Sequence, residues 1–124
     1  MGGVKPVFDT NILIDYLCGI TPAKDEMSRY PEIYISTITW IEVMAGSRDR
    51  SEEQTVRRFL DGFVRVAVDQ EIADLSFQIR RQHRVKLPDA IIWATARRKN
   101  TLLVTRNIKD FPESEPDIRL PYRL

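Results

Sequence analysis

Short apolar segments alternate along this chain with longer segments of helical periodicity. The clearest helix places Val56, Phe59, Leu60 and Phe63 at positions i, i+3, i+4 and i+7, which form one buried stripe. The segments predicted as strands are 4–8, 33–35, 64–68 and 101–105. The predicted helices are 10–17, 22–29, 38–45 and 88–98, with two more beginning near 51 and 69. Strands separated by helices favour βαβ units, so we expect an α/β fold with a mainly parallel sheet.

Residues with strong local preferences mark the ends of these elements. Gly46 is suited to follow the helix 38–45, and Ser51 and Asp69 are expected to cap the helices that begin beside them. The tail after Phe111 contains three prolines and is predicted to be mostly irregular, with a short edge strand near Ile118.

Three acids lie where a predicted strand gives way to a helix. Asp9 follows the first strand, Glu42 lies just inside the helix after the second strand, and Asp89 opens the apolar helix 88–98. Because the carboxyl ends of parallel strands share one edge of a sheet, these acids are expected to converge in space. Clustered carboxylates repel one another unless a cation neutralises them. The pattern therefore predicts a Mg²⁺ or Mn²⁺ site.

Each acid also has a purely structural interpretation. Asp9 fits an N-cap, Glu42 fits a capping box with Thr39, and Asp89 fits the first turn of a helix, where the dipole favours an anion. Asp69 has the same placement and is interpreted as a cap. Apolar neighbours surround Glu42 and Asp89, and no Lys or Arg is placed locally to pair with them. A buried acid requires a partner, which favours the metal interpretation.

Composition narrows the class of protein. The chain has 124 residues, of which 43% are hydrophobic and 30% charged, as in a globular domain. No apolar run approaches the roughly 20 residues of a membrane span, and no secretory pattern begins the chain. Cys18 is the single cysteine, which excludes an internal disulfide, and we expect it to be a small buried apolar residue. We expect a cytoplasmic protein without membrane contact.

Basic residues are concentrated on both sides of Asp89, although the net charge is only +1. Before Asp89 they are Arg80, Arg81, Arg84 and Lys86, and after it they are Arg97, Arg98, Lys99, Arg106 and Lys109. The candidates for RNA binding are the first four and Arg106. These cations fit solvated helix ends, and they equally fit a phosphate-binding rim around an acidic centre. Charge alone does not decide between the two.

Four stretches of the chain, in order, resemble the PIN-domain ribonucleases, most closely the VapC-like toxins of prokaryotic toxin–antitoxin pairs. They are 8–11 (FDTN), 36–42 (STITWIE) with Gly46, 87–96 (LPDAIIWATA) and 103–111 (LVTRNIKDF). The resemblance covers essentially the whole chain. It implies a single PIN-like domain over 1–124, with a doubly wound α/β sheet flanked by helices.

The resemblance also implies a catalytic centre and partners. It implies a metal-dependent endoribonuclease that acts on RNA, a cognate antitoxin protein and a homodimer. Asp9, Glu42 and Asp89 match the first three acids of the family. Thr10 and Thr105 match hydroxyl positions that orient the site.

The fourth acidic position of the family falls near Asn107, which is a departure because an amide does not ionise. Asp110 follows three residues later and is expected to supply the charge, either directly or through water. Asn107 then joins the residues that orient the site.

The chemistry of the residues agrees with this resemblance. Mg²⁺ prefers oxygen ligands, takes one or two carboxylates and retains several waters, one of which can attack a phosphodiester. Asp9 and Asp89 are expected to be the direct ligands, with Glu42 ligating or aligning a water. Alternatives are a structure-specific DNA nuclease, a non-catalytic PIN-like binding module and a phosphoacceptor receiver domain. A receiver needs paired acids after its first strand and a Lys after its fifth, whereas Asp9 has no acidic neighbour and Arg106 follows the late strand.

Overall fold

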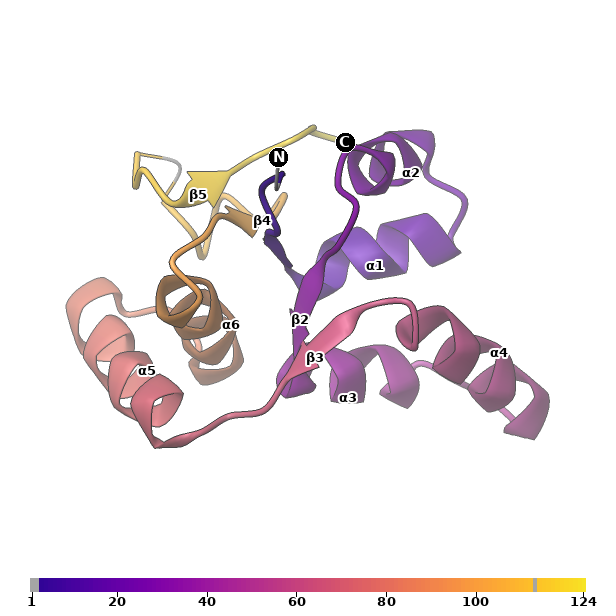
Figure 1. The fold of residues 1–124 in the computed structure, drawn as a ribbon, viewed down its shortest axis with the longest axis horizontal. Coiled ribbons are helices and arrows are strands. Elements are labelled where there is room, and N and C mark those ends of the chain that lie inside the picture. The colour runs from indigo at the N-terminus through magenta and orange to yellow at the C-terminus, as the bar shows by residue number, and fades with distance from the viewer. Residues whose placement is uncertain (1–2, 113) are drawn as a thin grey trace.

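The computed structural model describes residues 3–112 and 114–124, and its elements alternate as the sequence predicts (Figure 1). The strands are β1 Val7–Phe8, β2 Tyr34–Ser36, β3 Val64–Val66, β4 Leu103–Val104 and β5 Ile118–Arg119. The helices are α1 Thr10–Leu17, α2 Thr21–Ser28, α3 Thr37–Ala45, α4 Arg50–Leu60, α5 Gln70–His83 and α6 Leu87–Arg98. The predicted short strand near Ile118 is confirmed. Within the described residues, no helix is long and apolar enough to span a membrane.

The five strands form one parallel sheet in the order β3-β2-β1-β4-β5. Val7 of β1 is in register with Tyr34 of β2 on one side and Leu103 of β4 on the other. Along the chain, β2 and β3 are added to the sheet on one side of β1, and β4 and β5 are then added on the other side. The strand order therefore reverses between β1 and β4, and open α/β sheets bind ligands at such a switch point. The predicted doubly wound, mainly parallel fold is confirmed.

Helices cover both faces of the sheet, with α5 and α6 on one face and α1 to α4 on the other (Figure 1). Successive strand residues point to opposite faces. Val7 therefore packs in one core with Trp93 of α6, whereas Phe8 packs in a second core with Ile12 of α1. The indole N–H of Trp93 donates to Oδ2 of Asp117 at 2.9 Å, so this large side chain is buried without an unpaired polar atom.

The helix caps agree with the sequence at α5 and differ at α4. Asp69 caps α5, and its carboxylate accepts a backbone N–H of the first turn at 2.9 Å, as predicted. The prediction that Ser51 is the N-cap of the helix corresponding to α4 is wrong. Asp49 is the N-cap of α4, and its Oδ1 accepts the backbone N–H of Glu52 at 2.9 Å. The helix begins one residue earlier than expected, which places Ser51 inside its first turn.

Two further expectations from the sequence are corrected by tertiary structure. The predicted strand 64–68 ends at Val66, because β2, with which it pairs, turns into α3 after Ser36. Cys18 is exposed rather than buried. It lies at the C-cap of α1, beyond the part of the helix that packs on the sheet.

Candidate functional site

Asp9 follows β1 at the switch point, and groups from two strand ends hold its carboxylate. The side chain is buried, with 3% of its surface exposed. Oγ1 of Thr105, the residue after β4, donates to Oδ2 of Asp9 at 2.7 Å. The backbone N–H of Thr10 donates to Oδ1 at 2.8 Å. Asp9 is thus the N-cap of α1, but that role accounts for only one of its two oxygens.

Glu42 is joined to the same region by a hydroxyl group. Oγ1 of Thr10 donates to Oε1 of Glu42 at 2.7 Å and lies 3.1 Å from Oγ1 of Thr39. The capping-box interpretation of Glu42 is wrong, because the N-cap of α3 is Ser36, whose Oγ accepts the N–H of Ile38 at 3.1 Å. Thr39, the cap in that interpretation, is instead buried inside the helix.

The remaining two acids come from α6 and from the loop after β4. The expectation that Asp89 follows a strand is wrong, because the element before α6 along the chain is the helix α5. Asp89 is half-buried in the first turn of α6, directly behind Pro88. Nδ2 of Asn107 donates to Oδ2 of Asp110 at 2.7 Å, and the N–H of Asp110 lies 3.4 Å from Oδ1 of Asn107. The backbone N–H of Asn107 also donates to Oγ1 of Thr105 at 3.0 Å. One hydrogen-bonded loop therefore carries both the hydroxyl that binds Asp9 and the fourth acid.

The four carboxylates influence one another electrostatically. The pKa of Asp9 is raised from 3.8 to about 6, first by burial and then by the charges of Glu42 and Asp110, while the two hydrogen bonds to Asp9 act in the opposite direction. The pKa of Asp89 is raised to about 7, again first by burial and next by the charge of Asp9. The charges of Asp110 and Glu42 contribute further. Asp9 and Asp89 are therefore close enough to neighbouring carboxylates for the charged forms of these two acids to be disfavoured.

The donor set fits a hard divalent cation. Within the described ranges, none of the four carboxylates forms an ion pair with a Lys, Arg or His. In the same ranges, no three His, Cys, Asp or Glu side chains already surround a single ion position. An ion that takes one or two carboxylates and retains several waters suits this arrangement, and Mg²⁺ is bound in that way.

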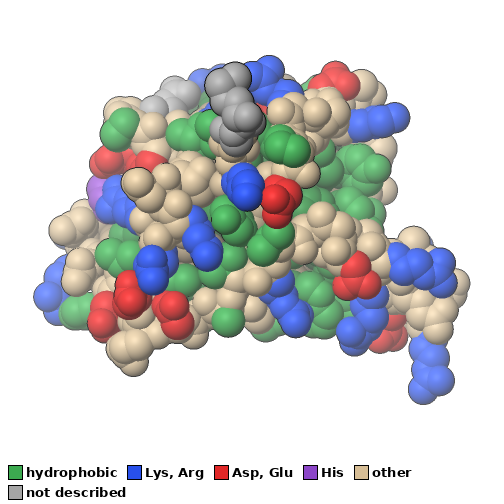
Figure 2. Space-filling view, viewed as in Figure 1, with side chains coloured by type: hydrophobic (Ala, Val, Ile, Leu, Met, Phe, Trp, Pro, Cys, Tyr) green, Lys and Arg blue, Asp and Glu red, His purple; other side chains and the backbone are tan. Residues whose placement is uncertain are grey.

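Four of the predicted basic residues lie on the surface between α5 and α6. They are Arg80, Arg81, Arg84 and Lys86, and all four are exposed. Among the described residues, none of them forms an ion pair with a carboxylate. Figure 2 shows acidic and basic side chains mixed across the face that it views. Phosphate binding would therefore depend on a local group of cations such as this one.

Phe77 belongs to the same surface, and the sequence reasoning missed it. Its side chain is 54% exposed on α5, and it lines a shallow hollow with Arg80, Arg81 and Arg84. The guanidinium of Arg81 lies 4.3 Å from the centre of the Phe77 ring. The available signal was that Phe77 falls outside the buried stripe of Ile72, Ser76 and Ile79, which leaves a large aromatic side chain facing solvent.

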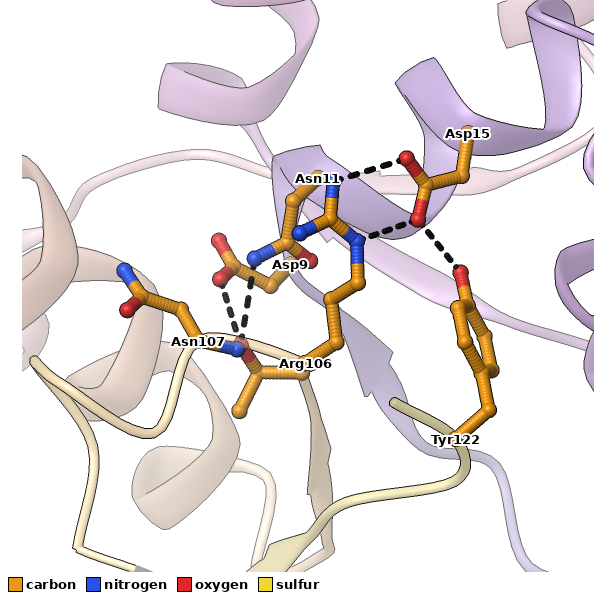
Figure 3. Close-up of polar contacts among 7 residues, drawn as sticks. Asp9, Asn11, Asp15, Arg106, Asn107 and Tyr122 are labelled. Carbon is orange, nitrogen blue, oxygen red and sulfur yellow. Dashed lines mark hydrogen bonds and ion pairs between the residues drawn. The ribbon is translucent and has the colours of Figure 1, made fainter. Parts of the chain in front are cut away.

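Arg106 differs from the other predicted basic residues. Its Nη2 donates to Oδ1 of Asp15 at 2.8 Å and its Nε donates to Oδ2 of the same carboxylate (Figure 3). The guanidinium of Arg106 is therefore engaged in a bidentate ion pair within the protein. Arg106 is consequently not part of the exposed basic surface formed by Arg80, Arg81, Arg84 and Lys86.

Asn11 belongs to the stretch 8–11 that carries the resemblance, but the sequence assigned it no role in the site. Its amide lies beside the Asp9 carboxylate in Figure 3, and Nδ2 is 3.4 Å from Oγ1 of Thr105. Its Oδ1 is buried and has no hydrogen-bond partner among the described residues. A buried, unpaired acceptor next to the acids is a group that a ligand or a water can use.

Fold and site together define a class: open α/β proteins with an acidic centre at the switch point of the sheet. The chain matches the PIN domain family over residues 7–113. It therefore belongs to the PIN domain family, and the resemblance seen in the sequence is confirmed. PIN-domain nucleases generally use divalent metal ions. The receiver-domain alternative is excluded, and the observed strand order also differs from the 2-1-3-4-5 order of that fold.

Several solved structures are similar to the chain. One is a toxin–antitoxin complex from Klebsiella pneumoniae, with a TM-score of 0.91, 42% identity, and coverage of 97% of this chain and 100% of that chain. DNA-bound VapBC from Salmonella typhimurium has a TM-score of 0.76 and 23% identity, covering 94% and 96%. VapBC2 from Rickettsia felis, bound to a promoter DNA fragment, has a TM-score of 0.71 and 21% identity, covering 91% and 94%. No curated protein matches the chain.

Proposed function

We propose that this chain is a Mg²⁺- or Mn²⁺-dependent endoribonuclease, the toxin of a type II toxin–antitoxin pair that acts in the cytoplasm. The observation that carries the proposal is the group of four carboxylates at the switch point, none of which has a basic partner among the described residues. The 42% identity to a chain of the Klebsiella pneumoniae complex supports an antitoxin partner. A homodimer remains part of the proposal on the family resemblance alone.

The residues of the site have separate roles in the proposed reaction. When bound, a divalent cation would lower the pKa of a water and neutralise charge on the scissile phosphate. Asp9 and Asp89 would hold that cation, and Thr105 keeps the Asp9 carboxylate in one orientation through its 2.7 Å hydrogen bond. Glu42, oriented by Thr10, would ligate the cation or align a water. No protein nucleophile is required.

Asp110 and Asn107 would complete the site together. Asn107 donates to the Asp110 carboxylate and so restricts its rotation. Asn107 stands where the family has its fourth acid, and in this proposal Asp110, whose carboxylate the Asn107 amide orients, supplies the missing charge. This arrangement supports Asp110 as the source of the fourth negative charge.

The experiment that tests the function compares matched single-stranded RNA and DNA oligonucleotides with the purified protein. Cleavage of RNA is expected in Mg²⁺ or Mn²⁺ and is expected to disappear in EDTA, because the hydrolytic water depends on the cation. Restoring the metal should restore cleavage. RNA cleavage undiminished by EDTA would contradict the metal mechanism. Cleavage of DNA alone would favour a DNA nuclease, and RNA binding without cleavage in saturating Mg²⁺ or Mn²⁺ would favour a binding module.

The basic surface between α5 and α6 is proposed to bind the RNA backbone, with Phe77 stacking on a base. Replacing Arg80, Arg81, Arg84 or Lys86 with Gln is expected to weaken RNA binding and to reduce the salt slope by about 0.7 for each phosphate that the variant no longer neutralises. Phe77→Ala is expected to weaken binding about tenfold without changing the slope, because stacking releases no counterions. Fluorescence anisotropy over a salt series measures both effects.

Arg58→Gln provides a matched control for this surface. Arg58 is equally exposed but lies on α4, which covers the opposite face of the sheet. Its removal is expected to leave both affinity and slope unchanged. Equal effects from Arg58 and from the α5 arginines would mean that only the net charge matters.

A further inference from the structure

The buried acid Asp15 joins three separate parts of the chain. It lies in α1 with 5% of its surface exposed. Arg106, from the loop after β4, binds both of its oxygens, and the hydroxyl of Tyr122, from the tail after β5, donates to Oδ2 at 2.7 Å (Figure 3). Burial alone would raise the pKa of Asp15, but these hydrogen bonds and the charge of Arg106 lower it overall. The carboxylate is therefore ionised and fully engaged at neutral pH.

Arg106 stands between two residues that form the site. On one side Thr105 donates to Asp9 at 2.7 Å. On the other side the backbone N–H of Asn107 donates to Oγ1 of Thr105 at 3.0 Å, and its amide donates to Asp110 at 2.7 Å. Any movement of the Arg106 backbone would therefore displace groups that orient two of the four acids.

We infer that Asp15, Arg106 and Tyr122 form a clamp that positions the loop 105–110, and through it the carboxylates of Asp9 and Asp110. None of the three is proposed to contact the substrate, so they are positioning residues rather than catalytic ones. The inference rests on the proposed nuclease function, because it assigns the clamp to the same acidic site.

The chemistry of the clamp suits positioning better than stabilisation. A buried ion pair contributes little net stability compared with packed apolar side chains, because both charges lose their hydration. A bidentate guanidinium–carboxylate pair does, however, fix the direction of both groups. Catalytic groups lose activity steeply with small displacements, up to about a hundredfold for about 1 Å. A rigid support one residue from Thr105 therefore affects rate far more than folding.

The chain contains a second buried carboxylate held by an arginine and a tyrosine, with Arg29 as an additional partner 3.7 Å from it. Glu26 of α2 is 4% exposed, and Arg119 of β5 binds both of its oxygens at 2.7 and 3.0 Å. The hydroxyl of Tyr30 donates to Oε2 of Glu26 at 2.9 Å. Arg119 is close to the loop only through its backbone, whose carbonyl accepts the N–H of Thr105 at 3.0 Å. A side-chain change at Arg119 leaves that backbone group in place, so this clamp is a matched internal control.

The test compares Arg106→Lys with Arg119→Lys and Tyr122→Phe with Tyr30→Phe in the full chain. Lysine keeps the charge but cannot form the bidentate pair. Melting temperature, kcat and KM are measured with a quenched fluorescent single-stranded RNA of mixed sequence in Mg²⁺. Both members of each pair are expected to lose similar stability. Arg106→Lys is expected to lower kcat about tenfold or more at unchanged KM, with a smaller loss for Tyr122→Phe, whereas the controls stay within about twofold of wild type.

Hydrogen exchange of the Asn107 amide provides a readout that needs neither RNA nor metal. Protection at this amide is expected to fall in Arg106→Lys and Tyr122→Phe and to persist in the two controls. The inference would be overturned if the variants of both clamps lost kcat and amide protection equally. It would also be overturned if the Arg106 and Tyr122 variants lost neither. Wild-type protein without cleavage would contradict the proposed function, and the exchange measurement would still decide whether the clamp positions the loop.

Discussion

Replacing Asp89 with asparagine is expected to reduce RNA cleavage by orders of magnitude while leaving the metal-free protein at least as stable as the wild type. The pKa of Asp89 is raised to about 7, first by burial and then by neighbouring carboxylates. Removing its charge relieves that repulsion, so the variant is expected to melt at an equal or higher temperature in EDTA at pH 8. In Mg²⁺ the order should reverse, because a cation that binds only the folded state stabilises the wild type more.

Asp69→Asn is the matched control for this prediction. Asp69, like Asp89, lies at the start of a helix, but its carboxylate serves as the N-cap of α5. Its loss of charge is expected to cost up to about 1 kcal/mol in EDTA and in Mg²⁺ alike, with cleavage retained. If Asp89→Asn behaved in the same way, Asp89 would act only at the N-terminus of α6. Calorimetry and RNA cleavage under both conditions separate the two outcomes.

The metal-free protein is expected to lose stability as the pH rises from about 4.5 to about 7.5. The folded-state pKa values of Asp9 and Asp89 lie above the unfolded value of 3.8, at about 6 and about 7. Their stabilisation is therefore fully present below the unfolded pKa and is lost as the pH rises through the folded pKa. For Asp9 alone the shift corresponds to about 3 kcal/mol. Chemical denaturation in EDTA across this range measures the loss.

The opposite behaviour is expected on the acid side of this window. Hydrogen bonds and guanidinium charges outweigh burial and hold the pKa values of Asp15 and Glu26 below their usual values. Their contribution is present above the unfolded pKa and is lost as the pH falls, which places the stability maximum at about pH 4.5. Asp9→Asn should flatten the neutral-pH decline, and saturating Mg²⁺ should remove it. Stability that rises steadily from pH 5 to pH 7.5 in EDTA would contradict the clustering of the acids.

Much of the fold could be predicted because it depends on local patterns. The helix α1 has the bounds expected from the sequence, and the cap at Asp69 and the strand near Ile118 were also predicted. Errors occurred where neighbours decide the outcome. Two residues of the predicted strand after Val66 are unpaired because β2 has already ended. Asp49 rather than Ser51 caps α4, because either side chain is chemically able to cap and only the backbone path selects one.

The site was predicted in part, for a comparable reason. Asp9 and Glu42 follow parallel strands and must approach one edge of the sheet, so their grouping could be expected from topology alone. Asp89 follows the helix α5, so only the tertiary structure shows that it joins them. The hydrogen bond from Thr10 to Glu42 could not be expected from the sequence, because a capping box between Thr39 and Glu42 fits the same residues. Phe77 was missed because the interpretation of α5 considered its buried stripe and its charges, and not the aromatic residue left outside both.

By itself, the sequence determined the order of strands and helices, the α/β class and the positions of Asp9 and Glu42 after strands, because side-chain periodicity and capping act over a few residues. Only the tertiary structure decided which charges neutralise one another. Arg106 looked like a phosphate ligand, yet it binds Asp15, which is 91 residues away in the chain. Arg119 likewise binds Glu26, 93 residues away. The partner of an Arg or Lys depends on which distant segment of the chain packs against it in the fold. Once the charged group is buried it needs such a partner, because it has lost its hydration.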